Sequence, residues 1–231
     1  MKIEPSLVNK KLLIFDMDGT LYQFKEGSFK KSKLQKIILK RAQQFIKKKL
    51  NITKRQTKQD LNKIIAKYGE NISIGLEKEY GLSRSQYFNY VWNLPPKLFI
   101  KKQPSLRKKI INWNKYFCIL LLSDSPKVWI ENVLKELGIF DLFQDKIISG
   151  EGNNRKIFIN VFPKIITDYK IMAKDCLVVG DQEETDIIPA KNIGMTTVFV
   201  SNNKKSEKAY FNIKNIFELD KIIKQGKHLY K

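Results

Sequence analysis

The sequence contains one histidine, two cysteines and no long apolar segment. With only His228 available, catalytic triads based on histidine and zinc sites built from several histidines are not expected. The apolar runs are far shorter than a membrane span or a signal peptide, so we expect a protein of the reducing cytoplasm with no membrane partner. If the chain is an enzyme, carboxylates must therefore carry the acid-base chemistry.

The two cysteines, Cys118 and Cys176, each lie inside an apolar run typical of a buried strand. We therefore expect two buried thiols and neither a disulfide nor a metal pair. The chain has 231 residues, of which 42% are hydrophobic. This is enough for one large α/β domain, or for a core domain with a smaller second one.

Acidic residues are also few: 23 against 44 basic residues, which gives a net charge of +21. Residues 24–50 hold ten basic side chains and one acidic one, and such a surface can attract polyanions such as RNA. However, 39 of the basic residues are lysines and only five are arginines, whereas nucleic-acid sites favour arginine. We interpret the charge as compositional bias that also steers small phosphates electrostatically.

The most informative segment is residues 11–22, KLLIFDMDGTLY. Its apolar run predicts a buried parallel strand, which places Asp16 and Asp18 at the carboxyl end, where open α/β sheets bind ligands. Two carboxylates that share one space require a divalent cation, or a proton on one of them. The alternative is an ordinary surface turn at Asp18-Gly19.

A second segment, residues 176–186, also combines an apolar run with two aspartates. Its sequence, CLVVGDQEETD, predicts a buried strand that is followed by Asp181 and Asp186. Such hard oxygen ligands suit Mg²⁺. The alternative is a solvated acidic loop, because Glu183 and Glu184 lie between the two aspartates.

A third apolar run, FCILLLSDS at residues 117–125, ends in Ser123, whose hydroxyl can donate to a ligand or simply cap the strand. Ser125, Pro126 and Gly138 predict a helix with a hydroxyl N-cap, proline at its first position and glycine just past its end.

Strands are predicted at residues 11–16, 117–122, 146–148, 176–180 and 196–200. Their alternation with helical patterns predicts a parallel sheet with helices on both faces. Between residues 22 and 100 the apolar residues instead repeat at helical spacing, and Ser83 with Gln86 forms a capping-box pattern. The apolar residues from Ile213 to Ile223 predict a terminal helix.

Taken together, these motifs resemble those of the haloacid dehalogenase-like hydrolases, a superfamily that includes aspartate-nucleophile phosphatases. The resemblance implies an α/β, Rossmann-like core of residues 1–22 and 101–231, with an inserted all-helical cap of residues 23–100. It also implies that Asp16 is the nucleophile, that Asp18 is the general acid and base, and that a magnesium site includes Asp16, Asp18, Asp181 and Asp186.

The resemblance further implies a phosphate-binding lysine and a hydroxyl residue. Lys156 is the candidate lysine, at the start of a periodic stretch that includes Ile157 and Phe158, with Arg155 and Lys146 as alternatives. Ser123 would bind phosphoryl oxygen together with Asp124, although relatives often carry Asn at the second position.

Residues 66–98 resemble the cap of the pyrimidine 5′-nucleotidase branch. We therefore expect a Mg²⁺-dependent phosphatase of small phosphorylated metabolites, with nucleoside 5′-monophosphates as the leading substrates. The enzyme alternatives are a phosphomutase or phosphotransferase and a phosphoglycolate-type sugar phosphatase. The non-enzyme alternative is a basic nucleic-acid-binding protein on an inert copy of the fold.

Overall fold

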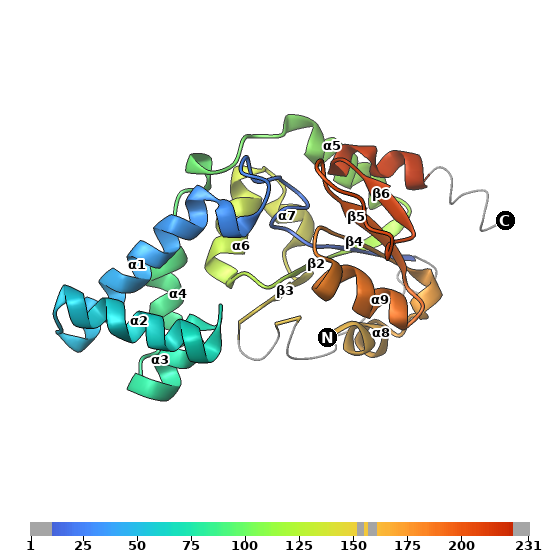
Figure 1. Cartoon of the computed structure of the whole chain (residues 1–231). Coiled ribbons are helices and arrows are strands. Elements are labelled where there is room, and N and C mark those ends of the chain that lie inside the picture. The colour runs from blue at the N-terminus through green and yellow to red at the C-terminus, as the bar shows by residue number, and fades with distance from the viewer. Residues whose placement is uncertain (1–10, 152–154, 157–160, 224–231) are drawn as a thin grey trace.

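The computed structural model describes residues 11–151, 155–156 and 161–223. Six strands form one parallel sheet in the order β3-β2-β1-β4-β5-β6 (Figure 1). The strands are β1 (Lys11–Phe15), β2 (Phe117–Ser123), β3 (Ile147–Ser149), β4 (Cys176–Gly180), β5 (Thr196–Val200) and β6 (Phe211–Ile213). This confirms the predicted α/β, Rossmann-like parallel sheet, and the five predicted strands agree to within one residue at each end.

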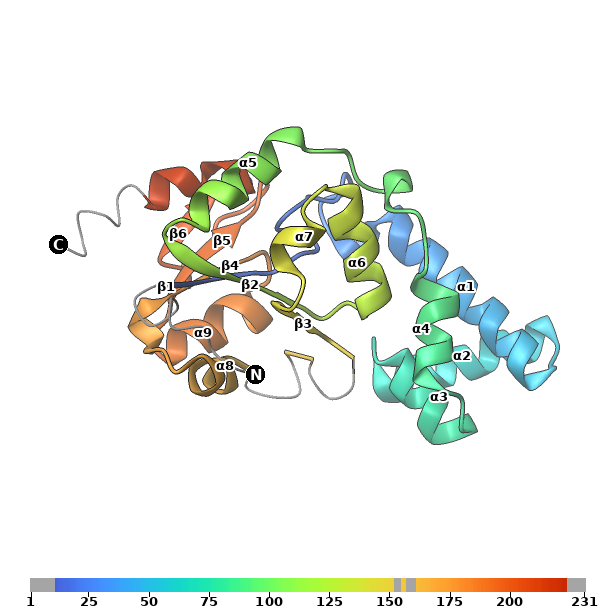
Figure 2. The ribbon, with the colours of Figure 1, turned by 180° about the vertical axis from the view of Figure 1, so that it is seen from behind.

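Helices cover both faces of the sheet because side chains along each strand alternate between the faces (Figure 2). Leu13 and Phe15 of β1 pack with one set of helices, and Leu12 and Ile14 pack with the other. The first set is α5 (Pro104–Trp113), α6 (Lys127–Glu136) and α7 (Phe140–Phe143), and the second is α8 (Val161–Tyr169) and α9 (Ile188–Asn192).

A separate group of helices lies between β1 and α5 in the sequence and beside the sheet in space (Figures 1 and 2). It consists of α1 (Lys33–Leu50), α2 (Lys54–Tyr68), α3 (Ile72–Tyr80) and α4 (Arg84–Trp92). Ser83 caps α4 by accepting a hydrogen bond from the Gln86 amide, as its sequence pattern predicts. The helical spacing over residues 22–100 therefore corresponds to real helices.

The order of the strands in the sheet determines where a ligand-binding site is expected. Successive connections run from β1 through β2 to β3 on one side, and the chain then returns to β4 on the other side of β1. Ligands of open α/β sheets bind at such a switch point, at the carboxyl ends of the strands. Phe15 is in register with Val179, so the residues that follow β1 and β4 emerge side by side.

Two local predictions are wrong. Pro126, not Ser125, is the N-cap residue of α6, because the helix begins at Lys127 and the Ser125 hydroxyl is used elsewhere. Ile213 belongs to β6, since pairing with β5 overrides its helical spacing, and helix begins only further on, in residues 216–223. Lys156 lies in a turn, and the helix predicted to start there would run through residues 157–160, which lie outside the described part of the chain.

Three further residues named in the sequence predictions lie outside the described part of the chain: Ile157, Phe158 and His228. Cys118 and Cys176 are both buried, as expected, and neither is in a disulfide bond within the described residues. Within the described part of the chain, the helices lack the combination of length and apolar composition needed to cross a bilayer.

Gly75 in α3 provides a test of packing within the helical group. A Cβ atom at this position would lie 2.8 Å from Ile64 Cγ2 and 2.7 Å from Tyr68 Cδ2, both in α2. We expect Gly75→Ala to lower the free energy of unfolding by about 1 kcal/mol, because overpacking costs more than the improved helix propensity of alanine contributes. Urea denaturation measures this. Lys78→Ala at an exposed position of the same helix is the control, and a stabilised Gly75→Ala protein would contradict the packing.

Candidate active site

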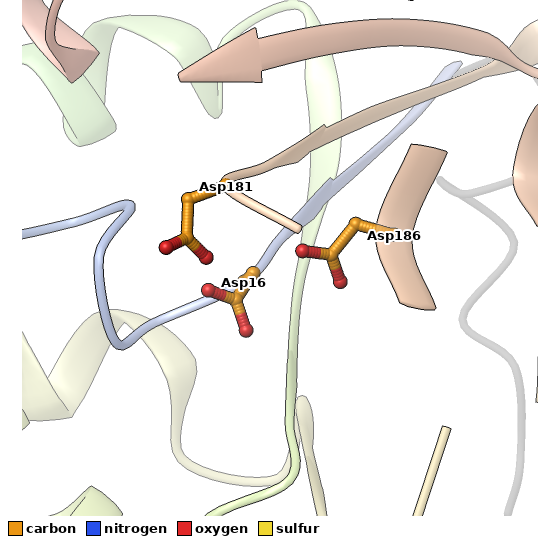
Figure 3. Close-up of side chains that lie close together, drawn as sticks. All are labelled: Asp16, Asp181 and Asp186. Atoms are coloured by element: carbon orange, nitrogen blue, oxygen red, sulfur yellow. The ribbon is translucent and has the colours of Figure 1, made fainter. Parts of the chain in front are cut away.

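Three carboxylates meet at the carboxyl edge of the sheet (Figure 3). Asp16 directly follows β1, Asp181 directly follows β4, and Asp186 lies in the π-helical turn Glu183–Ile187. Each contributes an oxygen, and these three oxygens all lie within 4.8 Å of one another. The Asp16 amide donates to the carbonyl of Val179 over 2.9 Å, which ties the end of β1 to β4. Aspartates from distant segments are thereby held around one small space.

Lys156 lies against this group. Its Nζ donates to Asp16 Oδ1 over 2.7 Å and to Asp186 Oδ1 over 2.6 Å, and the residue is only 8% exposed. Burial alone would lower the pKa of Lys156, but attraction to Asp16 and Asp186 outweighs burial and raises it, so the ammonium stays charged. Of the three basic residues considered from the sequence, Lys156 is the one that contacts these carboxylates, whereas Arg155 points elsewhere.

The carboxylates carry more negative charge than Lys156 neutralises. Burial raises the pKa of Asp186 to about 6, and burial with the charges of Asp16 and Asp186 raises the pKa of Asp181 well above its ordinary value. Asp181 Oδ1 is buried and has no hydrogen-bond partner among the described residues. Three carboxylates around one ammonium, with an unpartnered oxygen, fit a hard divalent cation.

Two glycines allow the carboxylates to approach this closely. Gly19 has φ +97°, and a Cβ atom there would lie 2.2 Å from Asp181 Oδ2. A Cβ atom at Gly180 would lie 2.4 Å from Asp186 Cγ. A larger residue at either position would push an aspartate out of the group.

The carboxylate of Asp18 is not part of this group of three. Its Oδ1 accepts hydrogen bonds from the Tyr22 hydroxyl and, over 3.0 Å, from Trp129 Nε1, and its Oδ2 accepts from Ser125 Oγ over 2.6 Å. Burial raises the pKa of Asp18, although these three donors oppose the shift. The oxygens of the Asp18 side chain face these three donors, and among the described residues the carboxylates close enough to share a metal ion are those of Asp16, Asp181 and Asp186. The metal contact of Asp18 therefore stays a prediction.

Ser123 and Asp124 lie at the end of β2. Ser123 is buried and its Oγ accepts a hydrogen bond from the Ser125 amide over 3.2 Å, which leaves the hydroxyl hydrogen available to a ligand. Asp124 Oδ1 accepts from the amide of Lys156 over 2.8 Å. The expected contact of Asp124 with a phosphoryl group is therefore not supported: this carboxylate holds the turn that carries Lys156, and as an acceptor it would repel phosphate.

The family resemblance also implies that backbone N–H groups of the loop after Asp16 contact the phosphoryl group. The amides of Gly19, Thr20 and Leu21 all donate to carbonyl groups inside the loop, to Tyr22 and Met17. These three amides stabilise the loop itself and are not available to a phosphoryl group.

A cavity of about 650 Å³ opens from the carboxylates toward the helical group. Asp16, Ser123 and Lys156 line it on the sheet side, and Phe29, Tyr87 and Trp92 line it on the helical side. A bound molecule can therefore place one end among the charges and the other against aromatic rings.

Sequence reasoning missed four side chains of the site. Thr20 donates to Asp16 Oδ2 over 3.0 Å, and Tyr22, Ser125 and Trp129 surround Asp18. Thr20 and Tyr22 lie within the first motif, so a search for hydroxyl groups four residues after each aspartate would have found them. Trp129 carries no such signal, because it is 111 residues from Asp18 and its helical spacing indicates only core packing.

Comparison with known proteins agrees with the site. The sequence profile of the haloacid dehalogenase-like hydrolases matches residues 10–194. A glyceraldehyde 3-phosphate phosphatase from Pyrococcus furiosus is 26% identical over 210 residues, which cover 85% of this chain and 83% of that protein.

Solved structures show the same fold. A phosphatase of this family from Thermococcus onnurineus superposes with a TM-score of 0.62 at 21% identity, covering 92% of this chain and 97% of that one. The hydrolase YfnB from Bacillus subtilis, a structure described as bound to magnesium, superposes with a TM-score of 0.55 at 19% identity, covering 94% and 99% of the two chains.

The matched segment spans well over half of the chain, and the similar proteins include phosphatases of the same family. These findings argue against the non-enzyme alternative, a nucleic-acid-binding protein on an inert fold. The chain belongs to the haloacid dehalogenase-like hydrolases.

Proposed function

We propose that this protein is a Mg²⁺-dependent phosphatase of small phosphate monoesters that works through an aspartyl-phosphate on Asp16. The observation that carries the proposal is the group of Asp16, Asp181 and Asp186, two of which contact Lys156, beside a cavity that Asp16, Asp18, Asp181 and Lys156 line. A nucleophile, a proton carrier and a cation site are thus next to one another.

Asp16, Asp181 and Asp186 would hold the Mg²⁺ ion. When bound, Mg²⁺ supplies neutralising charge for the phosphoryl oxygens and for the carboxylates. The unpartnered Asp181 Oδ1 and the excess of carboxylates over ammonium groups support this assignment.

In the first half of the reaction, an oxygen of Asp16 attacks phosphorus in line and the bond to the ester oxygen breaks. Asp18 gives its proton to the leaving oxygen, so an alcohol departs. In the second half, Asp18 takes a proton from water, the water oxygen attacks phosphorus, and the bond to Asp16 breaks. The contacts of Asp18 with Tyr22, Trp129 and Ser125 support this role, since they fix a carboxyl group beside the nucleophile.

Lys156 and Ser123 would bind the phosphoryl oxygens. The ammonium of Lys156 already contacts Asp16, so it lies where charge develops on the transferred group. The Ser123 hydroxyl faces the same cavity from the end of β2. Asp124 serves this function indirectly by fixing the Lys156 turn.

We further propose that residues 23–100 act as a cap over a core formed by residues 1–22 and 101–231. The helical group contributes Tyr87 and Trp92 to the cavity, and Phe29 lines it just before α1; these contacts support a role in excluding water and selecting the leaving group.

A nucleoside 5′-monophosphate is the proposed substrate. A cavity of about 650 Å³ with aromatic rings opposite the carboxylates suits a phosphate ester that carries a ring, and it is large for a three-carbon phosphate. The resemblance of residues 66–98 to the pyrimidine 5′-nucleotidase cap supports the same choice. The second candidate is glyceraldehyde 3-phosphate, which the name of the Pyrococcus furiosus relative favours.

The metal assignment is tested by binding. We expect Asp181→Asn to weaken Mg²⁺ binding at least about tenfold in calorimetric titration, because one charged ligand is lost. Glu184→Gln removes the same charge from an exposed position three residues away and should leave the affinity unchanged. Equal weakening by both changes would support a general acidic loop and contradict a defined site.

The catalytic assignments are tested by turnover of a phosphate monoester. We expect Asp16→Asn to abolish turnover, because no covalent intermediate can form, and Asp18→Asn to lower kcat on the order of 10² to 10⁴. Asp168→Asn removes an exposed carboxylate paired with Lys164 and is the control. Near-normal rates for either site variant would refute its assignment.

The substrate assignment is tested with a panel of phosphates. We expect kcat/KM for UMP or CMP to exceed that for glyceraldehyde 3-phosphate at least about tenfold, because the nucleotide fills the aromatic side of the cavity. A higher kcat/KM for glyceraldehyde 3-phosphate than for UMP or CMP would make the triose phosphate the proposed substrate in place of the nucleotide. Transfer to an added sugar in place of water would identify a phosphomutase or phosphotransferase.

A further inference from the structure

Two aromatic side chains converge on one oxygen of Asp18. Tyr22, six residues after Asp16 in the first motif, donates its hydroxyl hydrogen to Asp18 Oδ1. Trp129 of α6 donates its indole N–H to the same oxygen over 3.0 Å. The other oxygen, Oδ2, contacts Ser125 Oγ over 2.6 Å. Asp18 is thus held at both oxygens by groups outside the carboxylate cluster.

The two donors are themselves held by a chain of rings. We call Tyr22, Phe24, Phe29, Trp92 and Trp129 the aromatic arc. Successive ring centroids lie 5.4, 5.9, 6.1 and 6.4 Å apart, and the arc begins and ends on residues that donate to Asp18 Oδ1.

Burial makes the two ends of the arc rigid. Tyr22 is 2% exposed and Trp129 is fully buried. Trp129 also packs against Phe99, at 5.9 Å between ring centroids, where the chain returns from the helical group toward α5. Neither ring can turn without displacing its neighbours, so the direction of both donors is fixed.

We propose that Tyr22 and Trp129 are positioning residues that hold the Asp18 carboxyl group in the orientation required for proton transfer to the leaving oxygen. Both donors occupy lone pairs of Oδ1, so a proton carried by Asp18 resides on Oδ2, the oxygen shared with Ser125. The two rings thereby select which oxygen delivers the proton. This inference rests on the proposed function, because it takes Asp18 as the general acid.

Leaving groups of different basicity test the inference. A basic alkoxide needs protonation as it departs, whereas p-nitrophenolate departs with little help, so the contribution of a general acid is visible mainly with alkyl phosphates. The ratio kcat/KM reports the steps up to the first phosphoryl transfer, so it excludes the later hydrolysis of the shared intermediate.

Trp129→Phe keeps an aromatic ring and removes the N–H group. We expect kcat/KM for an alkyl phosphate to fall about tenfold, the order of one hydrogen bond to a charged group, and kcat/KM for p-nitrophenyl phosphate to change less than about threefold. Tyr22→Phe should give the same pattern, and it keeps the inference testable if Trp129→Phe does not fold. Equal losses with both substrates for these variants would overturn the inference.

Trp113→Phe is the matched control. Trp113 is also buried, and its Nε1 donates to an aspartate, Asp220, over 2.7 Å, but neither residue lines the cavity. Trp113→Phe should leave the ratio of the two substrates' kcat/KM values unchanged, and a shifted ratio would overturn the inference.

Asp18→Asn separates the inference from the proposed function. A loss with Asp18→Asn that does not depend on the leaving group would refute the general-acid role itself. A selective loss with Asp18→Asn and an unselective loss with Trp129→Phe would overturn only the positioning role.

Discussion

The contact of Lys156 with Asp16 and Asp186 is the interaction on which the site depends. Buried carboxylates repel one another and lose hydration, so they can share a small volume only with compensating positive charge. One ammonium group compensates part of this charge, and the unpartnered oxygen of Asp181 is where compensation is missing. The same imbalance that costs stability is what makes the site able to bind a cation and an anionic substrate.

The fold makes this crowding possible through strand order and small residues. β1 and β4 are adjacent although 160 residues separate them, so Asp16 and Asp181 emerge from neighbouring strand ends. Gly19 and Gly180 then remove the side-chain volume that would keep the aspartates apart. Backbone geometry therefore sets the distances between the carboxylates, and the aspartate side chains supply the negative charge.

The helical group and the core are linked by side-chain contacts in addition to the cavity that both line. The aromatic arc includes Phe24 and Phe29 from the first segment that connects them, and its last ring, Trp129, packs against Phe99 of the second. Both ends of the arc donate to Asp18, while Asp124 fixes the turn of Lys156. In the proposed mechanism, the proton carrier and the phosphate ligand would thus each be held by a neighbouring residue that need not contact substrate. Precise placement of this kind is what general acid catalysis and charge stabilisation require.

The sequence by itself determined five of the six strands, the buried thiols and the positions of Asp16, Asp18, Ser123 and Asp181 at predicted strand ends, because apolar periodicity and motif spacing are local properties. It also indicated Lys156 among 44 basic residues, through the family resemblance and the periodic stretch that follows this lysine. Only the tertiary structure decided that Asp18 faces Trp129, that Asp124 supports a turn and that Ser125 binds an aspartate. These depend on which residues meet across the fold, and local pattern carries no information about contacts between residues that lie far apart in the sequence.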